Sequence, residues 1–144
     1  MRRGFTLIEL LVVLVLIAMV AAILVPGAVR NSDRIAVEHQ VTRTVLAYRH
    51  AWSAATSTQR LAILRLTPDS IAIRSVPLSG APETLLVTLQ PGPAAAGVRL
   101  EAPHTAVFGP DGVGLGVSNT THVLTRGAVT RRITVSRLGR VRLP

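Results

Sequence analysis

The chain has 144 residues and a formal net charge of +9, because sixteen arginines and no lysine stand against seven acidic residues. This length suits one small domain with accessory segments. The basic balance points to polyanions such as nucleic acid or anionic lipid as partners, although a coding preference for arginine would produce the same charge. The absence of cysteine excludes disulfides, redox pairs and thiolate metal sites.

The strongest signal is an apolar run at the N-terminus. Residues 5–25 contain only two clearly polar side chains, Thr6 and Glu9. A helix over these 21 residues is about 30 Å long, which matches the hydrocarbon core of a bilayer. Because Arg2 and Arg3 precede the run, the positive-inside rule places the N-terminus in the cytoplasm and the rest of the chain across the membrane.

An ordinary signal peptide, cut near Ala21 or Ala22, is the main alternative, but Glu9 argues against it. An acidic residue in a spanning helix costs about 2.5–3.5 kcal/mol at the centre and less near the end. A signal peptide gains nothing from that cost. No other residue of the run carries a charge, so the partner of Glu9 must be created by processing or supplied by another molecule.

The segment from Arg3 to Val13, Arg-Gly-Phe-Thr-Leu-Ile-Glu-Leu-Leu-Val-Val, resembles the leader junction of type IV pilins and of type II secretion pseudopilins. The resemblance implies that a prepilin peptidase cuts after Gly4 and N-methylates Phe5. Glu9 would then neutralise the new Phe5 amine of its own or of a neighbouring subunit and so direct filament assembly. Residues 1–4 are the expected leader and residues 5–25 the expected transmembrane and filament-core helix.

Residues 26–57 are expected to form the second, amphipathic half of a long stalk helix. Pro26 lacks an amide hydrogen and should end or kink the apolar helix. The apolar positions that follow recur at helical spacing and form one stripe: Val37, Val41, Val45, Tyr48, Trp52 and Ala55. His39 and His50 share a helix face, but without further ligands they predict no metal site.

Residues 58–144 are dominated by short strand signals separated by turn residues. The expected strands are Leu61–Leu66, Ile71–Val76, Leu85–Leu89, Val98–Ala102, Thr105–Phe108, Val113–Val117, Val123–Thr125, Val129–Ser136 and Arg140–Leu143. Pro91–Gly97 is expected to be a mobile loop, and Gly109-Pro110-Asp111-Gly112 a hairpin turn. The predicted fold class is α+β: a long N-terminal helix packed on a C-terminal antiparallel sheet or β-sandwich, as in pilins.

The C-terminal half carries a second resemblance. Val107–Gly112, Arg132–Val135 and Leu138–Arg142 are similar to the ending of H-type (GspH) minor pseudopilins and of FimT-type minor pilins. The first implies a structural subunit of the type II secretion pseudopilus that takes part in protein secretion. Its partners would be other major and minor pseudopilins, and it would be a single-pass protein of the bacterial inner membrane with a periplasmic β domain.

The alternative is a FimT-type minor pilin of a type IV pilus, since some of these bind DNA for uptake through a Gly-Arg-x-Arg ending like Gly139–Arg142. Six arginines lie near this end without an acid among them: Arg126, Arg131, Arg132, Arg137, Arg140 and Arg142. They could bind phosphate oxygens, or they could be the solvated face of edge strands, where charge prevents edge-to-edge pairing. No aromatic residues are interleaved with them to favour nucleic acid.

Enzymatic motifs are absent. The sequence contains no Gly-x-Ser-x-Gly, P-loop, His-Glu-x-x-His or Gly-x-Gly-x-x-Gly pattern, and its few acids are scattered. We therefore expect no catalytic residue, cofactor, metal or small-molecule substrate. The protein is expected to be a substrate of the peptidase and not an enzyme.

Overall fold

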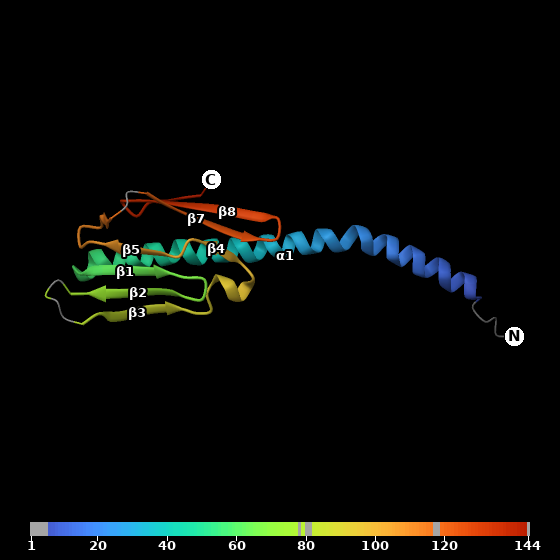
Figure 1. The fold of residues 1–144 in the computed structure, drawn as a ribbon, viewed down its shortest axis with the longest axis horizontal. Helices are drawn as coiled ribbons and strands as arrows, with labels where there is room; N and C mark the ends of the chain where they lie inside the picture. The colour runs from blue at the N-terminus through green and yellow to red at the C-terminus, as the bar shows by residue number, and fades with distance from the viewer. Residues whose placement is uncertain (1–5, 78, 80–81, 117–118, 144) are drawn as a thin grey trace.

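The computed structural model describes residues 6–77, 79, 82–116 and 119–143. A single long helix, α1 (Leu7–Thr58), is followed by nine strands and a 3₁₀ turn, η1 (Pro93–Ala96). Figure 1 shows that the strands cover only the second half of α1, while the first half projects away from the domain toward the N-terminus. The α+β class predicted from the sequence is confirmed: a long apolar N-terminal helix packs on antiparallel sheets.

Helix α1 is held at both ends by local interactions. Thr6 is its N-cap, and the last residues end on Gln59, whose positive φ of 54° turns the chain out of the helix. The helix does not end at Pro26, which lies inside it. Figure 1 shows a bent helix rather than a straight one, as expected where proline removes one backbone hydrogen bond.

The larger sheet, which we call sheet A, is antiparallel and has the strand order β3-β2-β1-β5-β6. Its strands are β1 (Leu61–Leu66), β2 (Ile71–Val76), β3 (Thr84–Leu89), β5 (His104–Phe108) and β6 (Gly114–Leu115). In β1 the side chains of Ala62, Leu64 and Leu66 are buried and alternate with more exposed ones. This period of two directs one face of the sheet toward α1.

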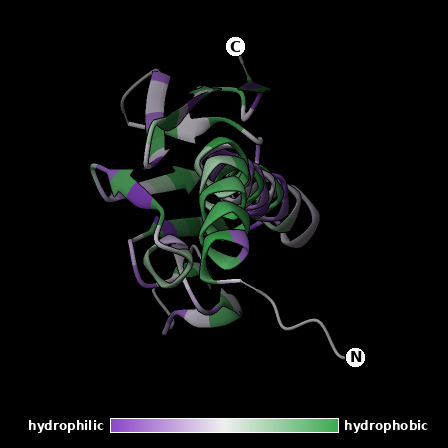
Figure 2. Ribbon diagram, turned by 90° about the vertical axis from the view of Figure 1, so that its right-hand side faces the viewer, coloured by the Kyte–Doolittle hydropathy of each residue, from purple (hydrophilic) through white to green (hydrophobic). Residues whose placement is uncertain are grey.

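The smaller sheet, sheet B, is also antiparallel and has the order β4-β7-β8-β9. Its strands are β4 (Arg99–Glu101), β7 (Asn119–Arg126), β8 (Val129–Ser136) and β9 (Val141–Arg142). Leu124 and Ile133 are buried on its inner face, where β7 and β8 contact α1. Figure 2, seen toward the end of the helix, shows the strands of the two sheets gathered on one side of it.

The hydrophobic core lies between α1 and the two sheets. The helix contributes a face of small and medium residues, including Val37, Val41, Ala51 and Ala55. The sheets contribute mostly leucine, isoleucine and valine. Most of the predicted apolar stripe is therefore buried. Trp52 differs: it is 43% exposed.

The segment Pro91–Gly97 is ordered, contrary to the expectation of a mobile loop. The Gly92 amide donates to the Asp69 carbonyl over 2.7 Å and the Ala94 amide to the Pro68 carbonyl over 2.8 Å. Arg43 of α1 also donates to the Pro91 carbonyl over 2.8 Å. The low-complexity composition suggested mobility, but here backbone hydrogen bonds and burial of Pro93 hold the turn.

Candidate functional site

The apolar half of α1 is a surface without a partner inside the molecule. Every residue from Thr6 to Arg30 is exposed. Leucine, isoleucine and valine occupy all sides of this stretch, with Leu7 at 82% and Ile23 at 78% exposure. By length and composition this helix could cross a membrane. A helix that is apolar all round is covered by lipid or by other protein, and not by water.

Glu9 lies in the first turn of α1, where it forms a capping box with Thr6. The Glu9 amide donates to Thr6 Oγ1 over 3.3 Å. In return Glu9 Oε2 accepts from the Thr6 amide over 3.1 Å and from Thr6 Oγ1 over 3.2 Å. The carboxylate therefore points back toward the start of the helix, where the macrodipole favours negative charge. Gly4 and Phe5, the predicted cleavage and methylation residues, lie outside the described residues.

The structure places the six C-terminal arginines in different surroundings. Arg126 Nε pairs with Asp33 Oδ1 over 2.9 Å, and Arg126 Nη1 donates to the Ala96 carbonyl over 2.6 Å. Arg137 Nε donates to the Gly114 carbonyl over 3.2 Å and so ties the end of β8 to β6. These side chains join parts of the domain to one another.

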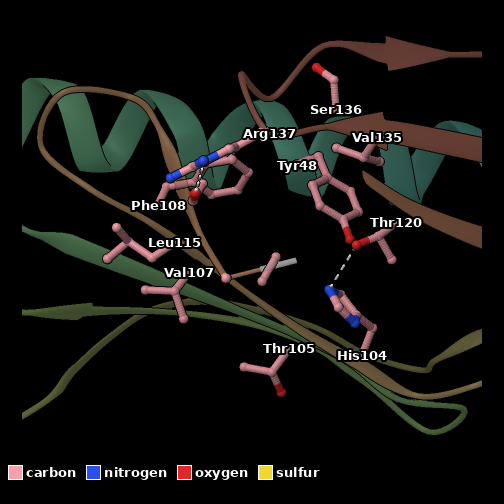
Figure 3. A pocket seen from close by; sticks show the side chains of 13 residues that line it. Tyr48, His104, Thr105, Val107, Phe108, Leu115, Thr120, Val135, Ser136 and Arg137 are labelled. Atoms are coloured by element: carbon pink, nitrogen blue, oxygen red, sulfur yellow. Dashed lines mark hydrogen bonds between the residues drawn. The ribbon is translucent and has the colours of Figure 1, made fainter. Parts of the chain in front are cut away.

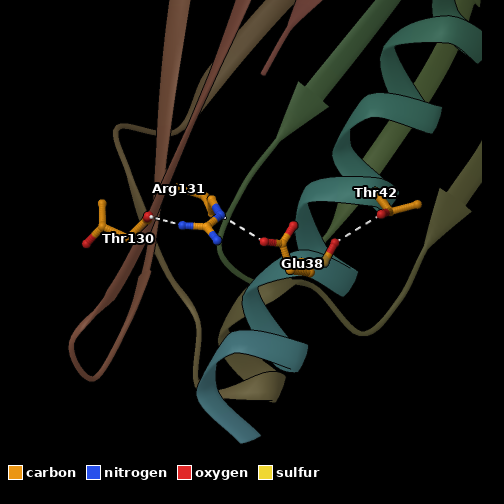
Figure 4. A network of polar contacts seen from close by, with 4 residues as sticks. All are labelled: Glu38, Thr42, Thr130 and Arg131. Carbon is orange, nitrogen blue, oxygen red and sulfur yellow. Dashed lines mark hydrogen bonds and ion pairs between the residues drawn. The ribbon is translucent and has the colours of Figure 1, made fainter. Parts of the chain in front are cut away.

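Arg131 is the third of these six arginines with a partner inside the domain. Its Nε pairs with Glu38 Oε1 of α1 over 2.8 Å, and its Nη1 donates to the Thr130 carbonyl over 3.3 Å (Figure 4). Arg126 and Arg131 share the inner face of sheet B with Leu124 and Ile133, because residues two apart on one strand point the same way. Both arginines lie on the side of the sheet that faces the helix.

Four of the six are exposed: Arg137, whose guanidinium bonds to the Gly114 carbonyl, and Arg132, Arg140 and Arg142. Arg142 is paired in register with Thr134, two residues after Arg132, so both arginines lie on the outer face of sheet B. A shallow hollow of about 360 Å³ borders this region. It is lined by Asn119, Thr134, Ser136, Leu138, Arg140 and Arg142. This outer face is the part of the predicted strip that is open to a phosphate-bearing ligand.

The glycines that carry the C-terminal resemblance make room for Trp52. Gly112 has a φ of +75° and Gly139 a φ of +70°, and a Cβ on either would meet the indole of Trp52 at 2.7 and 2.9 Å. Trp52 Nε1 donates to the Gly112 carbonyl over 3.1 Å. The turn around Pro110 and the turn before Arg140 therefore both pack against the Trp52 side chain.

A partly buried polar cluster that the sequence did not predict lies between the two sheets. Tyr48, which is 1% exposed, has its hydroxyl 2.6 Å from His122 Nε2. The ring centroids of His122 and His104 are 5.4 Å apart, and Thr120 Oγ1 is 3.3 Å from His104 Nε2. Tyr48, His104 and Thr120 of this cluster line a cavity of about 220 Å³ (Figure 3). Tyr48 appeared in the sequence only as part of an apolar stripe, and neither histidine stood in a motif.

The structure offers little to hold a metal ion. His39 and His50 are both exposed on α1. Within residues 6–77, 79, 82–116 and 119–143, no group of three or more His, Asp or Glu side chains lies close enough together to hold an ion.

Two comparisons with known proteins bear on this arrangement. Residues 1–25 match the family model of the prokaryotic N-terminal methylation motif. The fold is similar to the type IV minor pilin FimU of Pseudomonas aeruginosa, with a TM-score of 0.60 and 21% identity over 83% of this chain and 92% of FimU. A second crystal form of FimU gives a TM-score of 0.57 and 17% identity over 77% and 91%. No curated protein matches the chain by sequence. The chain thus combines the methylation motif with a pilin-like fold.

Proposed function

We propose that this chain is a minor structural subunit of a type II secretion pseudopilus, of the H type, which assembles through its N-terminal helix. The main support for this proposal is the structure of α1. Its first half exposes apolar side chains on all sides, while its second half is packed under both sheets in the same continuous element. Lipid can cover the first half before assembly, and helices of neighbouring subunits can cover it afterwards.

The proposed steps use the chain's own residues. Residues 1–4 are removed as a leader, residues 5–25 cross the inner membrane and later enter the filament core, residues 26–57 complete the stalk, and residues 58–144 form the periplasmic domain. Cleavage after Gly4 leaves a methylated, cationic amine on Phe5. Glu9 already points back toward this end of the helix through its bonds to Thr6. The carboxylate is thus available to that amine or to the amine of an adjacent subunit.

A DNA-binding minor pilin of a type IV pilus is the second candidate. It is favoured by the likeness to FimU, which is a type IV minor pilin, and by the exposed Arg132, Arg140 and Arg142. The secretion role is preferred because Arg126 and Arg131 are engaged in ion pairs with α1, which leaves a smaller charged surface for phosphates than the sequence suggested.

A deletion strain complemented with variants distinguishes the secretion role from the DNA-binding pilus role. We expect the deletion to abolish exoprotein secretion and to leave DNA uptake intact. The double variant Arg140→Ala/Arg142→Ala should restore secretion as well as the wild type does. The charge-matched control is Arg60→Ala/Arg65→Ala, because both of these arginines are also exposed. Intact secretion in the deletion strain, together with DNA uptake that depends on Arg140 and Arg142 but not on the control pair, would instead establish the pilus role.

A further inference from the structure

The cluster around His122 joins three separate elements of the domain. Tyr48 comes from α1, His104 from β5 of sheet A, and His122 with Thr120 from β7 of sheet B. The Tyr48 ring also packs edge-on against Phe108 of β5, with ring centroids 6.3 Å apart. Within the described residues, β5 and β7 belong to different sheets and are not paired by backbone hydrogen bonds. Side chains therefore make this part of the junction between the sheets.

The surroundings of the cluster favour the neutral form of both histidines. Burial raises the pKa of Tyr48 far above its ordinary value, so the phenol stays protonated. Its hydroxyl donates a hydrogen bond to His122 Nε2. Burial, reinforced by the charge of nearby His104, lowers the pKa of His122 to about 4. Burial also lowers the pKa of His104. Both imidazoles are therefore uncharged at neutral pH.

The described residues that line the cavity offer no opposite charge to stabilise an imidazolium. The polar side chains that border the cavity are Tyr48 from α1, His104 and Thr105 from β5, Thr120 from β7, and Ser136 and Arg137 at the end of β8. The charged one among them, Arg137, is itself cationic. None of the described residues lining the cavity is a carboxylate. A proton on His104 would thus lie near the cationic Arg137, and a proton on His122 would be buried beside His104.

We propose that His104 and His122 form an acid-sensitive clasp between the two sheets. In the neutral state the two rings pack against each other, and Tyr48 and Thr120 bond to them. Proton uptake by both places two like charges side by side, their ring centroids 5.4 Å apart, and sheet B separates from sheet A and α1. The junction then responds to the pH of the compartment in which the domain lies, a property beyond the assembly role.

The direction of the pH effect follows from the lowered pKa values. The unfolded or opened chain binds protons with the ordinary histidine pKa of 6.5, whereas the closed domain binds them only at lower pH. The contribution of His122 is therefore complete above pH 6.5 and is lost as the pH falls toward 4, and the contribution of His104 is lost in the same direction. Within this window His122 should raise the opening equilibrium constant by up to about tenfold per pH unit, and His104 should act in the same direction.

The test uses the full chain in detergent micelles and its single tryptophan. Trp52 reports on the junction, because it touches the turns at Gly112 and Gly139, which lie next to sheet A and sheet B respectively. We expect its fluorescence-monitored unfolding in denaturant to become easier from pH 7 to pH 5, and His104→Gln/His122→Gln to flatten that dependence. The control is His39→Gln/His50→Gln, because both of these histidines are exposed on α1.

His104→Gln alone is the milder variant, since His104 is only partly buried. It should make the pH dependence of the opening constant shallower and leave the bond between Tyr48 and His122 in place. It keeps the test decisive if the double variant does not fold. An unchanged pH slope in His104→Gln, or a slope that disappears in the control pair instead, would overturn the proposal.

Discussion

Glu9→Gln should lower incorporation of the protein into filaments by more than a hundredfold, while membrane insertion and leader cleavage continue. The reason is electrostatic: the mature Phe5 amine would be buried between helices without its counter-charge. Breaking a buried ion pair by removing one partner costs about 3–5 kcal/mol. The measurement is the amount of the protein in sheared filaments divided by the amount in the membrane pool.

The substitution by glutamine removes the charge of Glu9 but keeps the helix cap. Its side-chain oxygen can still accept from the Thr6 amide and hydroxyl, which now bond to Glu9 Oε2. The complementary variant Thr6→Ala removes the hydroxyl of the capping box but keeps the carboxylate, so we expect it to cost about 1 kcal/mol of helix stability and to leave incorporation nearly intact. Equal losses in the two variants would mean that the cap matters and the charge does not.

Gly92→Ala should lower the unfolding free energy of the domain by about 3 kcal/mol and its Tm by roughly 10 °C. A Cβ at this position would lie closer to backbone atoms of Pro68, Asp69 and Ser70 than real Cβ atoms do. Backbone cannot move aside as a flexible side chain can. The Gly92 amide is also hydrogen-bonded to the Asp69 carbonyl, so the turn cannot shift without losing that bond.

Gly27→Ala is the matched control for that substitution. A Cβ at Gly27 meets nothing within 4 Å, and the residue lies inside α1. Alanine is the better helix former by about 0.5–1 kcal/mol, so this variant should be neutral or slightly more stable. Thermal unfolding followed by circular dichroism compares the two variants. A Gly92→Ala protein as stable as Gly27→Ala would show that the turn at Pro93 is not packed as described.

Most of the strand pattern could be predicted because it rests on local signals. Each of the nine expected segments overlaps a strand, and Leu61–Leu66, Ile71–Val76 and Val129–Ser136 have the predicted bounds. Apolar alternation and turn residues mark such strands without knowledge of their partners. The hairpin turn at Pro110 is likewise local: the Gly112 amide donates to the Gly109 carbonyl over 2.9 Å.

What the sequence could not predict depends on contacts between distant residues. Arg126 and Arg131 looked like members of one strip with the exposed arginines, but their ion pairs with Asp33 and Glu38 form only once β7 and β8 lie on α1. Tyr48 and His122 are 74 positions apart, and no local pattern joins them. Trp52 was expected in the core, yet the indole lies at its edge beneath two glycine turns.

The central claim, that this is a filament subunit made from a cleaved and methylated precursor, is tested most directly at the N-terminus. Intact-mass spectrometry of the protein from sheared filaments should give a mature chain that begins with N-methyl-Phe5, having lost residues 1–4. The methylation motif matched over residues 1–25 is the basis of this expectation. A mature chain that begins near Ala22 or Ile23, without the apolar half of α1, would contradict the account.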